Sequence, residues 1–173
     1  HDIKFNYIPC LLGGIMKLSN NQPPMITLAE IPNKMKYEFE TAFNRFMKEH
    51  NITKFKMNEH FPVNTISLIR GAIVAQKHEF FESYLEIVLS GLWEQSLKLD
   101  SPEALHELLK KYDCHADLVI EEIAKDETKQ ELIKNTNEAT EKGAFGIPTF
   151  FVGEEMFYGK DTLRELKEMA SSS

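Results

Sequence analysis

One segment near the C-terminal end constrains the fold of this chain most strongly. It opens with Gly143-Ala-Phe-Gly-Ile-Pro148, in which two glycines precede an Ile-Pro step, and a β-rich run follows from Thr149 to Val152. A second β-rich run extends from Glu155 to Tyr158, and only Gly153-Glu154 separates the two. Two short runs joined by two turn residues are typical of an antiparallel hairpin. The sequence therefore predicts a sheet edge that is entered through a proline-containing loop.

The hairpin is followed by a helix, and a further strand candidate lies far upstream. Gly159-Lys-Asp161 leads from the second run into a helix that we expect to end near Ala170. Ile3 to Tyr7 alternates apolar and polar residues and stops before Pro9, which predicts a short strand. The two ends of the chain should thus share one small α/β domain.

Helical periodicity fills most of the chain between these strands. Apolar residues recur every three or four positions, as on the buried face of an amphipathic helix. The predicted helices are Lys34 to Glu49, Thr65 to Lys77, Glu79 to Lys98, a segment that begins at Ser101, Ala116 to Ala124, and Thr128 to Lys142. The first helix should pack Phe39, Phe43 and Phe46 inward. We expect one domain made of residues 1–13 and 143–173, and a helical insertion domain of residues 14–142.

The Ile147-Pro148 step is the most informative candidate for binding. Proline removes a backbone donor from the strand, and a cis bond would turn the preceding amide and carbonyl outward. In that case the backbone of Ile147 could pair with an extended peptide, in the manner of β-strand addition. A trans proline that simply begins a strand is the alternative, and the local sequence leaves both open.

Four polar residues are further binding candidates, each with an ordinary structural alternative. Lys160 and Asp161 begin the last helix, where backbone N–H groups attract a carboxylate, although Asp161 could also act as an N-cap. The side-chain amide of Asn21 could hold a polar ligand or could merely stabilise a turn. Lys34 could bind a carboxylate or extend into water. Taken one at a time, none of them identifies a site.

Composition and charge exclude several classes of function. The 173 residues carry a formal net charge of −7, and lysines and arginines occur singly or in pairs, so nucleic acid is not an expected partner. No apolar run approaches the length of about 20 residues that a membrane-spanning helix needs. With no signal-peptide pattern at its start, the chain is predicted to be cytoplasmic.

The cysteines and histidines predict neither a redox pair nor a metal site. Cys10 and Cys114 are too far apart in sequence for a Cys-x-x-Cys motif, and reduced structural thiols are the simplest interpretation. The six histidines show no spacing typical of metal ligands, so no metal is expected.

Several motifs together resemble one known family, the 2-hydroxychromene-2-carboxylate isomerases and kappa-class glutathione transferases. The similar segments occur in the same order over almost the whole chain, which makes the resemblance far more specific than any single motif. They are Leu11-Leu-Gly-Gly-Ile-Met-Lys17, Ser19-Asn-Asn-Gln-Pro-Pro24, Lys34-Met-Lys-Tyr37, Phe61-Pro-Val-Asn-Thr65, Gly143-Ala-Phe-Gly-Ile-Pro148 and Tyr158-Gly-Lys-Asp161.

The resemblance implies an α/β, thioredoxin-like (DsbA-type) fold with a large all-helical insertion, and glutathione as cofactor. In that family the residue before a cis proline pairs with the cysteinyl backbone of glutathione, and the matching pair in this chain is Ile147-Pro148. Asp161 and Lys160 match the positions that receive the γ-glutamyl end. Asn21 and Lys34 match positions that hold the rest of the tripeptide.

The resemblance also implies a catalytic serine at the start of a first helix, and no part of this sequence matches it. We expect that βα unit, with its serine, upstream of His1, so no catalytic residue is assigned within the 173 residues. The implied activity is glutathione-dependent isomerisation or transfer on a small electrophilic acceptor, aromatic acceptors included, by a homodimer. A DsbA- or FrnE-like thiol-disulfide oxidoreductase and a non-catalytic binding domain on the same fold are the alternatives.

Overall fold

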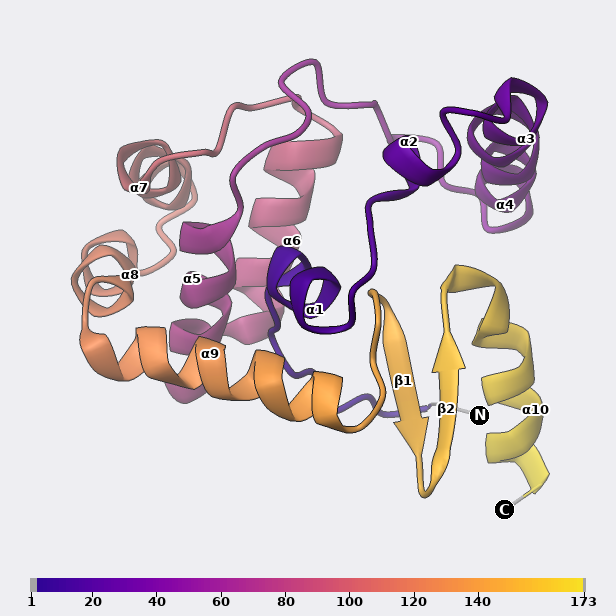
Figure 1. Ribbon diagram of the computed structural model, residues 1–173. Coiled ribbons are helices and arrows are strands. Elements are labelled where there is room, and N and C mark those ends of the chain that lie inside the picture. Colours follow the sequence, from indigo (N-terminus) through magenta and orange to yellow (C-terminus); the bar gives the residue numbers. More distant parts are fainter. Residues whose placement is uncertain (1–2, 173) are drawn as a thin grey trace. The chain divides into compact units, whose positions relative to one another are not determined.

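The computed structural model describes residues 3–172, with side chains up to Met169, and the chain divides into two compact units. Unit 1 contains the residues up to Asn21 and those from Leu132 onward, and unit 2 runs from Gln22 to Glu131. The sequence predicted boundaries after residues 13 and 142. Unit 1 of the structure also includes residues 14–21 and 132–142. Figure 1 shows the elements of both units.

All the regular secondary structure described in unit 2 is helical. Its elements are α2 (Pro24–Thr27), α3 (Pro32–Lys36), a π-helical segment (Tyr37–Ala42), α4 (Phe43–Glu49), α5 (Ile66–Lys77), α6 (Phe81–Trp93), α7 (Pro102–Lys111), α8 (Ala116–Ile123) and the first part of α9 (Asp126–Glu141). The Ser101 hydroxyl caps α7 by accepting a hydrogen bond from the Ala104 amide at 3.2 Å, and Pro102 occupies the first helical position. This cap explains the start of a helix that the sequence predicted at Ser101.

The core of unit 2 is built around Tyr84. Its side chain is 1% exposed, and its hydroxyl donates to the carbonyl of Leu68 at 2.8 Å. Gly71 makes room for the ring, since a β-carbon at this position would collide with the tyrosine hydroxyl. Leu105 and Val119, both fully buried, extend the same cluster to α7 and α8. The apolar residues that recur with a helical period in the sequence are therefore buried where α5, α6, α7 and α8 pack on one another.

The sequence prediction for Lys34 to Glu49 is only partly right. Residues 32–49 are helical throughout, but the middle turn is π-helical rather than α-helical. A wider turn changes the angle between successive side chains, so an apolar stripe counted at three and four residues loses its phase. Phe39, expected to pack inward, is 44% exposed, whereas Phe43 lies edge-on against the ring of Phe55.

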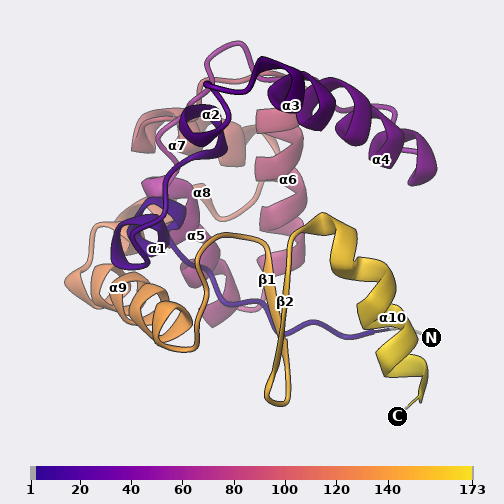
Figure 2. The ribbon, with the colours of Figure 1, turned by 45° about the vertical axis from the view of Figure 1, so that its right-hand side comes forward.

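Unit 1 contains the sheet. Its elements are α1 (Leu12–Leu18), the second part of α9, β1 (Thr149–Val152), β2 (Glu155–Tyr158), a 3-10 turn (Lys160–Thr162) and α10 (Leu163–Ser172). The two strands pair antiparallel, with Thr149 opposite Tyr158 and Val152 opposite Glu155, as the sequence predicted. Figure 2 shows the hairpin from its side, with α10 next to β2.

Helix α1 belongs to unit 1 because it contacts the second half of α9. The amide of Leu11 donates to the hydroxyl of Thr136 at 3.0 Å, and the Cys10 thiol lies 3.5 Å from the carbonyl of Asn135. Gly14 faces the methyl group of Thr136, and a β-carbon there would approach it to 2.8 Å. The contacts of Leu11 and Cys10 join segments that the sequence had placed in different domains.

The predicted strand from Ile3 to Tyr7 is not a strand among the residues described. This segment has no regular secondary structure, and the described sheet contains only β1 and β2. The apolar positions of the alternation are not buried either, since Phe5 is 38% and Tyr7 52% exposed, although the ring of Phe5 lies 5.7 Å from that of Phe150. A strand needs a neighbouring strand to bond with, and an alternating pattern alone does not supply one.

Candidate functional site

The loop that leads into β1 begins at a well-defined helix end. The amides of Gly143 and Ala144 bond back to the carbonyls of Thr140 and Ala139 at 2.9 and 3.0 Å, which is the Schellman pattern. Gly143 has φ = 103°, a conformation that side chains with a β-carbon rarely adopt. The end of α9 therefore fixes where the loop starts.

Ile147 presents its backbone at this loop. The Ile147–Pro148 peptide bond is cis, and the isoleucine is 44% exposed. Among the described residues, neither the N–H nor the C=O of Ile147 has a hydrogen-bond partner. The next carbonyl, that of Pro148, accepts from the amide of Gly159 at 2.9 Å and so continues the hairpin by one step. Ile147 thus offers an unpaired donor and acceptor directly beside a strand.

Three side chains contact the loop on the N-terminal side of Ile147. The amide group of Asn21 donates to the carbonyl of Phe145 at 2.8 Å. The hydroxyl of Thr149 donates to the carbonyl of Gly146 at 2.7 Å. The ring of Tyr158 covers Gly146, where a β-carbon would lie 2.9 Å from it, and its centroid is 4.5 Å from that of Phe145.

Lys160 and Asp161 follow immediately after the residue that bonds to Pro148. They form an ion pair with 2.6 Å between Nζ and Oδ1, and the aspartate side chain is 80% exposed. Gly159 has φ = 85° and its carbonyl accepts from the Thr162 hydroxyl at 2.9 Å, which stabilises the turn. The pair therefore sits on a fixed backbone with a carboxylate and an ammonium group available to water.

The structure assigns five of the six predicted site residues to unit 1, namely Asn21, Ile147, Pro148, Lys160 and Asp161. Lys34 lies on α3 in unit 2, where it is exposed, and its part in a site remains a prediction. Sequence reasoning did not single out Thr149 or Tyr158. A threonine and a tyrosine in a β-rich run are ordinary strand residues, so no sequence signal distinguished them.

Neither cysteine has the properties of a nucleophile. Burial raises the pKa of the Cys10 thiol and also that of the Cys114 thiol above their ordinary value. Both are free, Cys10 in unit 1 and Cys114 in unit 2. They fit the expected role of reduced structural thiols.

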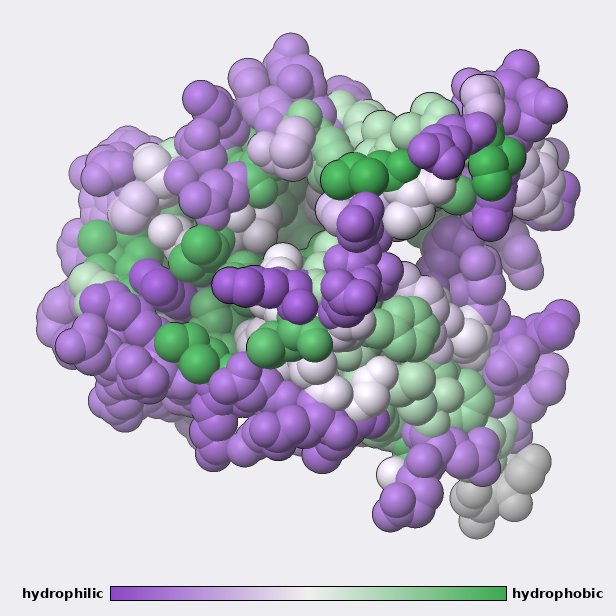
Figure 3. Space-filling model, in the orientation of Figure 1, coloured by the Kyte–Doolittle hydropathy of each residue, from purple (hydrophilic) through white to green (hydrophobic). Residues whose placement is uncertain are grey.

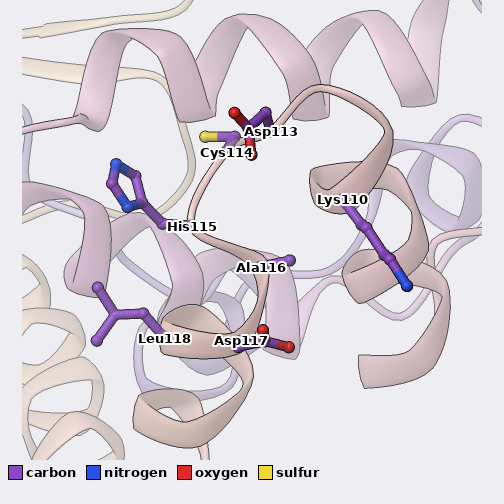
Figure 4. A pocket seen from close by; sticks show the side chains of 7 residues that line it. All are labelled: Lys110, Asp113, Cys114, His115, Ala116, Asp117 and Leu118. Atoms are coloured by element: carbon purple, nitrogen blue, oxygen red, sulfur yellow. The ribbon is translucent and has the colours of Figure 1, made fainter.

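A shallow depression in unit 2 lies where α7 ends and α8 begins. Its volume is about 360 Å³, and its lining residues run from Lys110 to Leu118. Figure 4 shows that the Lys110 ammonium points away from Cys114, so the polar groups do not converge on one point. His115, with φ = 46°, packs against the ring of Phe80 at 4.4 Å. The depression is formed by the turn between α7 and α8. Within the described part of the chain, no three metal-ligating side chains come together.

Unit 2 also exposes apolar side chains around α2. Met25, Ile26 and Ile31 are each more than half exposed, and the space-filling view in Figure 3 shows apolar surface over α2 and the start of α3. In residues 3–172, no helix combines the length and the apolarity needed to cross a bilayer. This apolar surface is a second feature of unit 2 that a bound molecule could cover.

The most buried carboxylate outside the loop is structural. Glu122 on α8 is 9% exposed and lies 3.1 Å from the imidazole of His78 and 3.5 Å from the ammonium of Lys77. Burial alone would raise the pKa of Glu122, but the hydrogen bond from His78 and the charges of Lys77 and Lys125 outweigh it and lower that pKa. These contacts tie the end of α5 to α8.

The substitution Glu122→Gln is expected to lower the free energy of unfolding by about 1 kcal/mol at neutral pH, since its partners are partly exposed. Because the pKa of Glu122 is lower in the folded protein, its contribution is complete above the ordinary carboxyl pKa and is lost as pH falls through the folded value. Urea unfolding of both proteins should therefore converge below about pH 4. Glu121→Gln, an exposed neighbour, is the control, and a difference that grows in acid would contradict this assignment.

Unit 1 contains the proline loop, the hairpin and the terminal helix, and its chain is interrupted between Asn21 and Leu132 by a helical unit. These features define a thioredoxin-like protein with a helical insertion. The family model of the DSBA-like thioredoxin domain matches residues 1–170, and the chain belongs to this family.

Its relatives confirm the resemblance found in the motifs. Glutathione S-transferase kappa 1 of Rattus norvegicus is 26% identical over 177 residues, which cover 95% of this chain and 76% of the relative. The 2-hydroxychromene-2-carboxylate isomerase of Pseudomonas sp. (strain C18) is 26% identical over 81 residues, or 47% of this chain and 38% of that one. The solved structure of a 2-hydroxychromene-2-carboxylate isomerase superimposes with a TM-score of 0.77 at 18% identity, covering 94% of this chain and 77% of that chain.

Proposed function

We propose that the protein is a glutathione-dependent enzyme of the isomerase or transferase type, acting on a small electrophilic molecule. The relatives that share its fold are named as a kappa-class glutathione transferase and as 2-hydroxychromene-2-carboxylate isomerases. Glutathione would supply the nucleophilic thiol, and the chain supplies the surface that binds and orients the tripeptide.

The observation that carries this proposal is the unpaired backbone of Ile147. Within the described residues its N–H and C=O have no partner, and the adjoining strand ladder ends at the Pro148 carbonyl. A peptide backbone placed there would gain two hydrogen bonds in the manner of an added strand. Glutathione is such a peptide, and its cysteinyl residue would be the one held at Ile147.

The charged ends of glutathione have complementary partners among the predicted site residues. The γ-glutamyl end carries an ammonium and a carboxylate, and the exposed Asp161 and its neighbour Lys160 would bind them. Lys34 is the proposed partner of the glycyl carboxylate. Ile147, whose side chain is exposed, would contact the cysteinyl part and keep water from one side of the sulfur.

Isomerisation and transfer differ in the step after addition of sulfur to the acceptor. In an isomerisation the carbon–sulfur bond breaks again after rotation of the acceptor, whereas in a transfer the adduct is released. The serine that would stabilise the thiolate remains a prediction, and we expect it upstream of His1. A Cys-x-x-Cys motif at that place would instead support a disulfide oxidoreductase of the same fold.

Calorimetric titration with reduced glutathione tests the binding site directly. We expect binding in the micromolar to millimolar range, and weaker binding of Cys-Gly, which lacks the γ-glutamyl group, and of γ-Glu-Cys, which lacks the glycyl carboxylate. Equal affinity for all three thiols would contradict the assigned contacts. An absence of glutathione binding would favour the non-catalytic alternative.

Three further expectations belong to this proposal and do not follow from the site itself. They are an electrophilic acceptor that includes aromatic compounds, a homodimer, and a cytoplasmic location. The exposed apolar residues around α2 suit either an acceptor or a second subunit.

A further inference from the structure

We propose that Asn21, Thr149 and Tyr158 are positioning residues that hold the proline loop in the shape that exposes the backbone of Ile147. These three side chains together form what we call the loop clamp. In this role Asn21 acts on glutathione binding through its hydrogen bond to the loop. The inference rests on the proposed function, because the clamp serves the peptide-binding edge.

The first part of the clamp is a hydrogen bond between segments distant in sequence. The Asn21 amide donates to the Phe145 carbonyl at 2.8 Å, across a separation of 124 residues. Asn21 lies in the turn after α1, and its own backbone amide bonds to the Met16 carbonyl at 2.8 Å. The side chain therefore reaches the loop from a backbone that is itself fixed to α1.

The second and third parts act on the neighbouring residue. The Thr149 hydroxyl donates to the Gly146 carbonyl at 2.7 Å, and the Tyr158 ring packs on the same glycine. Only a glycine fits under this ring, since a β-carbon would lie 2.9 Å from one ring carbon and 3.0 Å from the hydroxyl oxygen. Two successive carbonyls and one ring contact thus fix the backbone just before Ile147.

Fixing this backbone matters because Ile147 has no internal bond of its own among the residues described. A loop residue that must order itself on binding costs affinity through lost conformational entropy. The clamp removes that cost in advance by holding the two residues just before Ile147. Loss of a clamp contact should therefore weaken binding through the loop.

A double-mutant cycle separates this role from direct contact. Asn21→Ala and Thr149→Val each remove one bond to the loop, and each should raise the glutathione dissociation constant by about 3- to 10-fold. If both act through the loop, the double variant should be weaker by clearly less than the product of the single effects. Multiplicative effects would show that the two side chains act independently and would overturn the inference.

Two substitutions of Tyr158 test the ring contact, one that removes the ring and one that keeps it. Tyr158→Phe keeps the ring on Gly146 and should bind glutathione like the parent protein, whereas Tyr158→Ala should bind about 10-fold more weakly. Thr140→Val is the matched control, because its hydroxyl bonds inside α9, to the Thr136 carbonyl. In an activity assay the clamp variants should raise KM for glutathione and leave kcat at saturation nearly unchanged.

NMR relaxation of the loop backbone in the absence of ligand tests the clamp separately from binding. Asn21→Ala should lower the order parameters of the Gly146 and Ile147 amides, and Thr140→Val should not. If the parent protein binds glutathione but none of the clamp variants alters binding or these order parameters, the clamp is wrong and the proposed function stands. If the variants lower the order parameters while the parent binds no glutathione, the clamp stands and the proposed function fails.

Discussion

Tyr84→Ala is expected to lower the free energy of unfolding by about 3–5 kcal/mol, the loss typical of a large aromatic residue removed from a core. The side chain is 1% exposed and fits against Gly71, so the cavity has little freedom to close. The Leu68 carbonyl would also lose its donor. Urea unfolding followed by the fluorescence of Trp93, the one tryptophan of the chain and a residue of the same unit, measures the effect.

Tyr84→Phe separates the two contributions. It keeps the ring and removes only the hydroxyl, so we expect a loss of about 1–2 kcal/mol from the unpaired Leu68 carbonyl. Burial raises the pKa of Tyr84, with Cys114 as a smaller cause, so the hydroxyl remains a donor at every pH used for such measurements. A loss below about 1.5 kcal/mol for the alanine variant would show that the tyrosine is not the centre of this core.

Asp161→Ala is expected to raise the dissociation constant of glutathione by about 10- to 100-fold, the effect of losing a charge-assisted hydrogen bond. The carboxylate is 80% exposed, and its present partner is Lys160. A surface ion pair of this kind contributes little to folding, so the stability of the variant should be close to that of the parent protein. Calorimetric titration and urea unfolding of the same samples check both statements.

A glutathione analogue without its amino group identifies the contact. If Asp161 binds the γ-glutamyl ammonium, the analogue should bind the parent protein more weakly than glutathione does. The affinity of the analogue for the Asp161→Ala variant should then equal its affinity for the parent protein. Glu154→Ala is the matched control, because this exposed carboxylate lies in the turn at the opposite end of the hairpin. An equal loss of affinity for glutathione and the analogue in Asp161→Ala would assign the aspartate a different role.

The parts of the fold that depend on neighbours in sequence could be predicted from it. The hairpin from Thr149 to Tyr158 follows from two β-rich runs and a glycine turn, and the structure reproduces both strands. The start of α7 follows from Ser101 and Pro102, whose effects act within one helical turn. Such elements are determined by residues close together in the sequence, and the family resemblance predicted the overall fold.

The predictions that failed depended on partners elsewhere in the chain. The alternation from Ile3 to Tyr7 corresponds to neither a buried face nor a described strand, because Phe5 and Tyr7 are 38% and 52% exposed and pairing with a second strand is a property of the fold. The π-helical turn at Tyr37–Ala42 likewise has no signal in a spacing rule that assumes a uniform helix.

The candidate site shows the same limit. The loop and the Lys160-Asp161 pair could be predicted, because glycine, proline and a helix start are local signals. The bond from Asn21 to Phe145 and the contact of Tyr158 with Gly146 could not, because they require the folded unit. Sequence reasoning thus proposed Asn21 and the loop as parts of a site, but it did not single out Thr149 or Tyr158 and could not give the contact between Asn21 and the loop.

Unit 1 is built from two segments that are separated in the sequence by unit 2, and this affects the order in which the protein folds during translation. Every member of the main hydrophobic cluster of unit 2 lies between Leu68 and Ile123, so this core is complete while the hairpin is still untranslated. Unit 1 must wait, because the bonds from Leu11 to Thr136 and from Asn21 to Phe145 span more than a hundred residues. A folded helical unit then replaces a long flexible loop, and residues translated after this unit complete the proposed ligand edge.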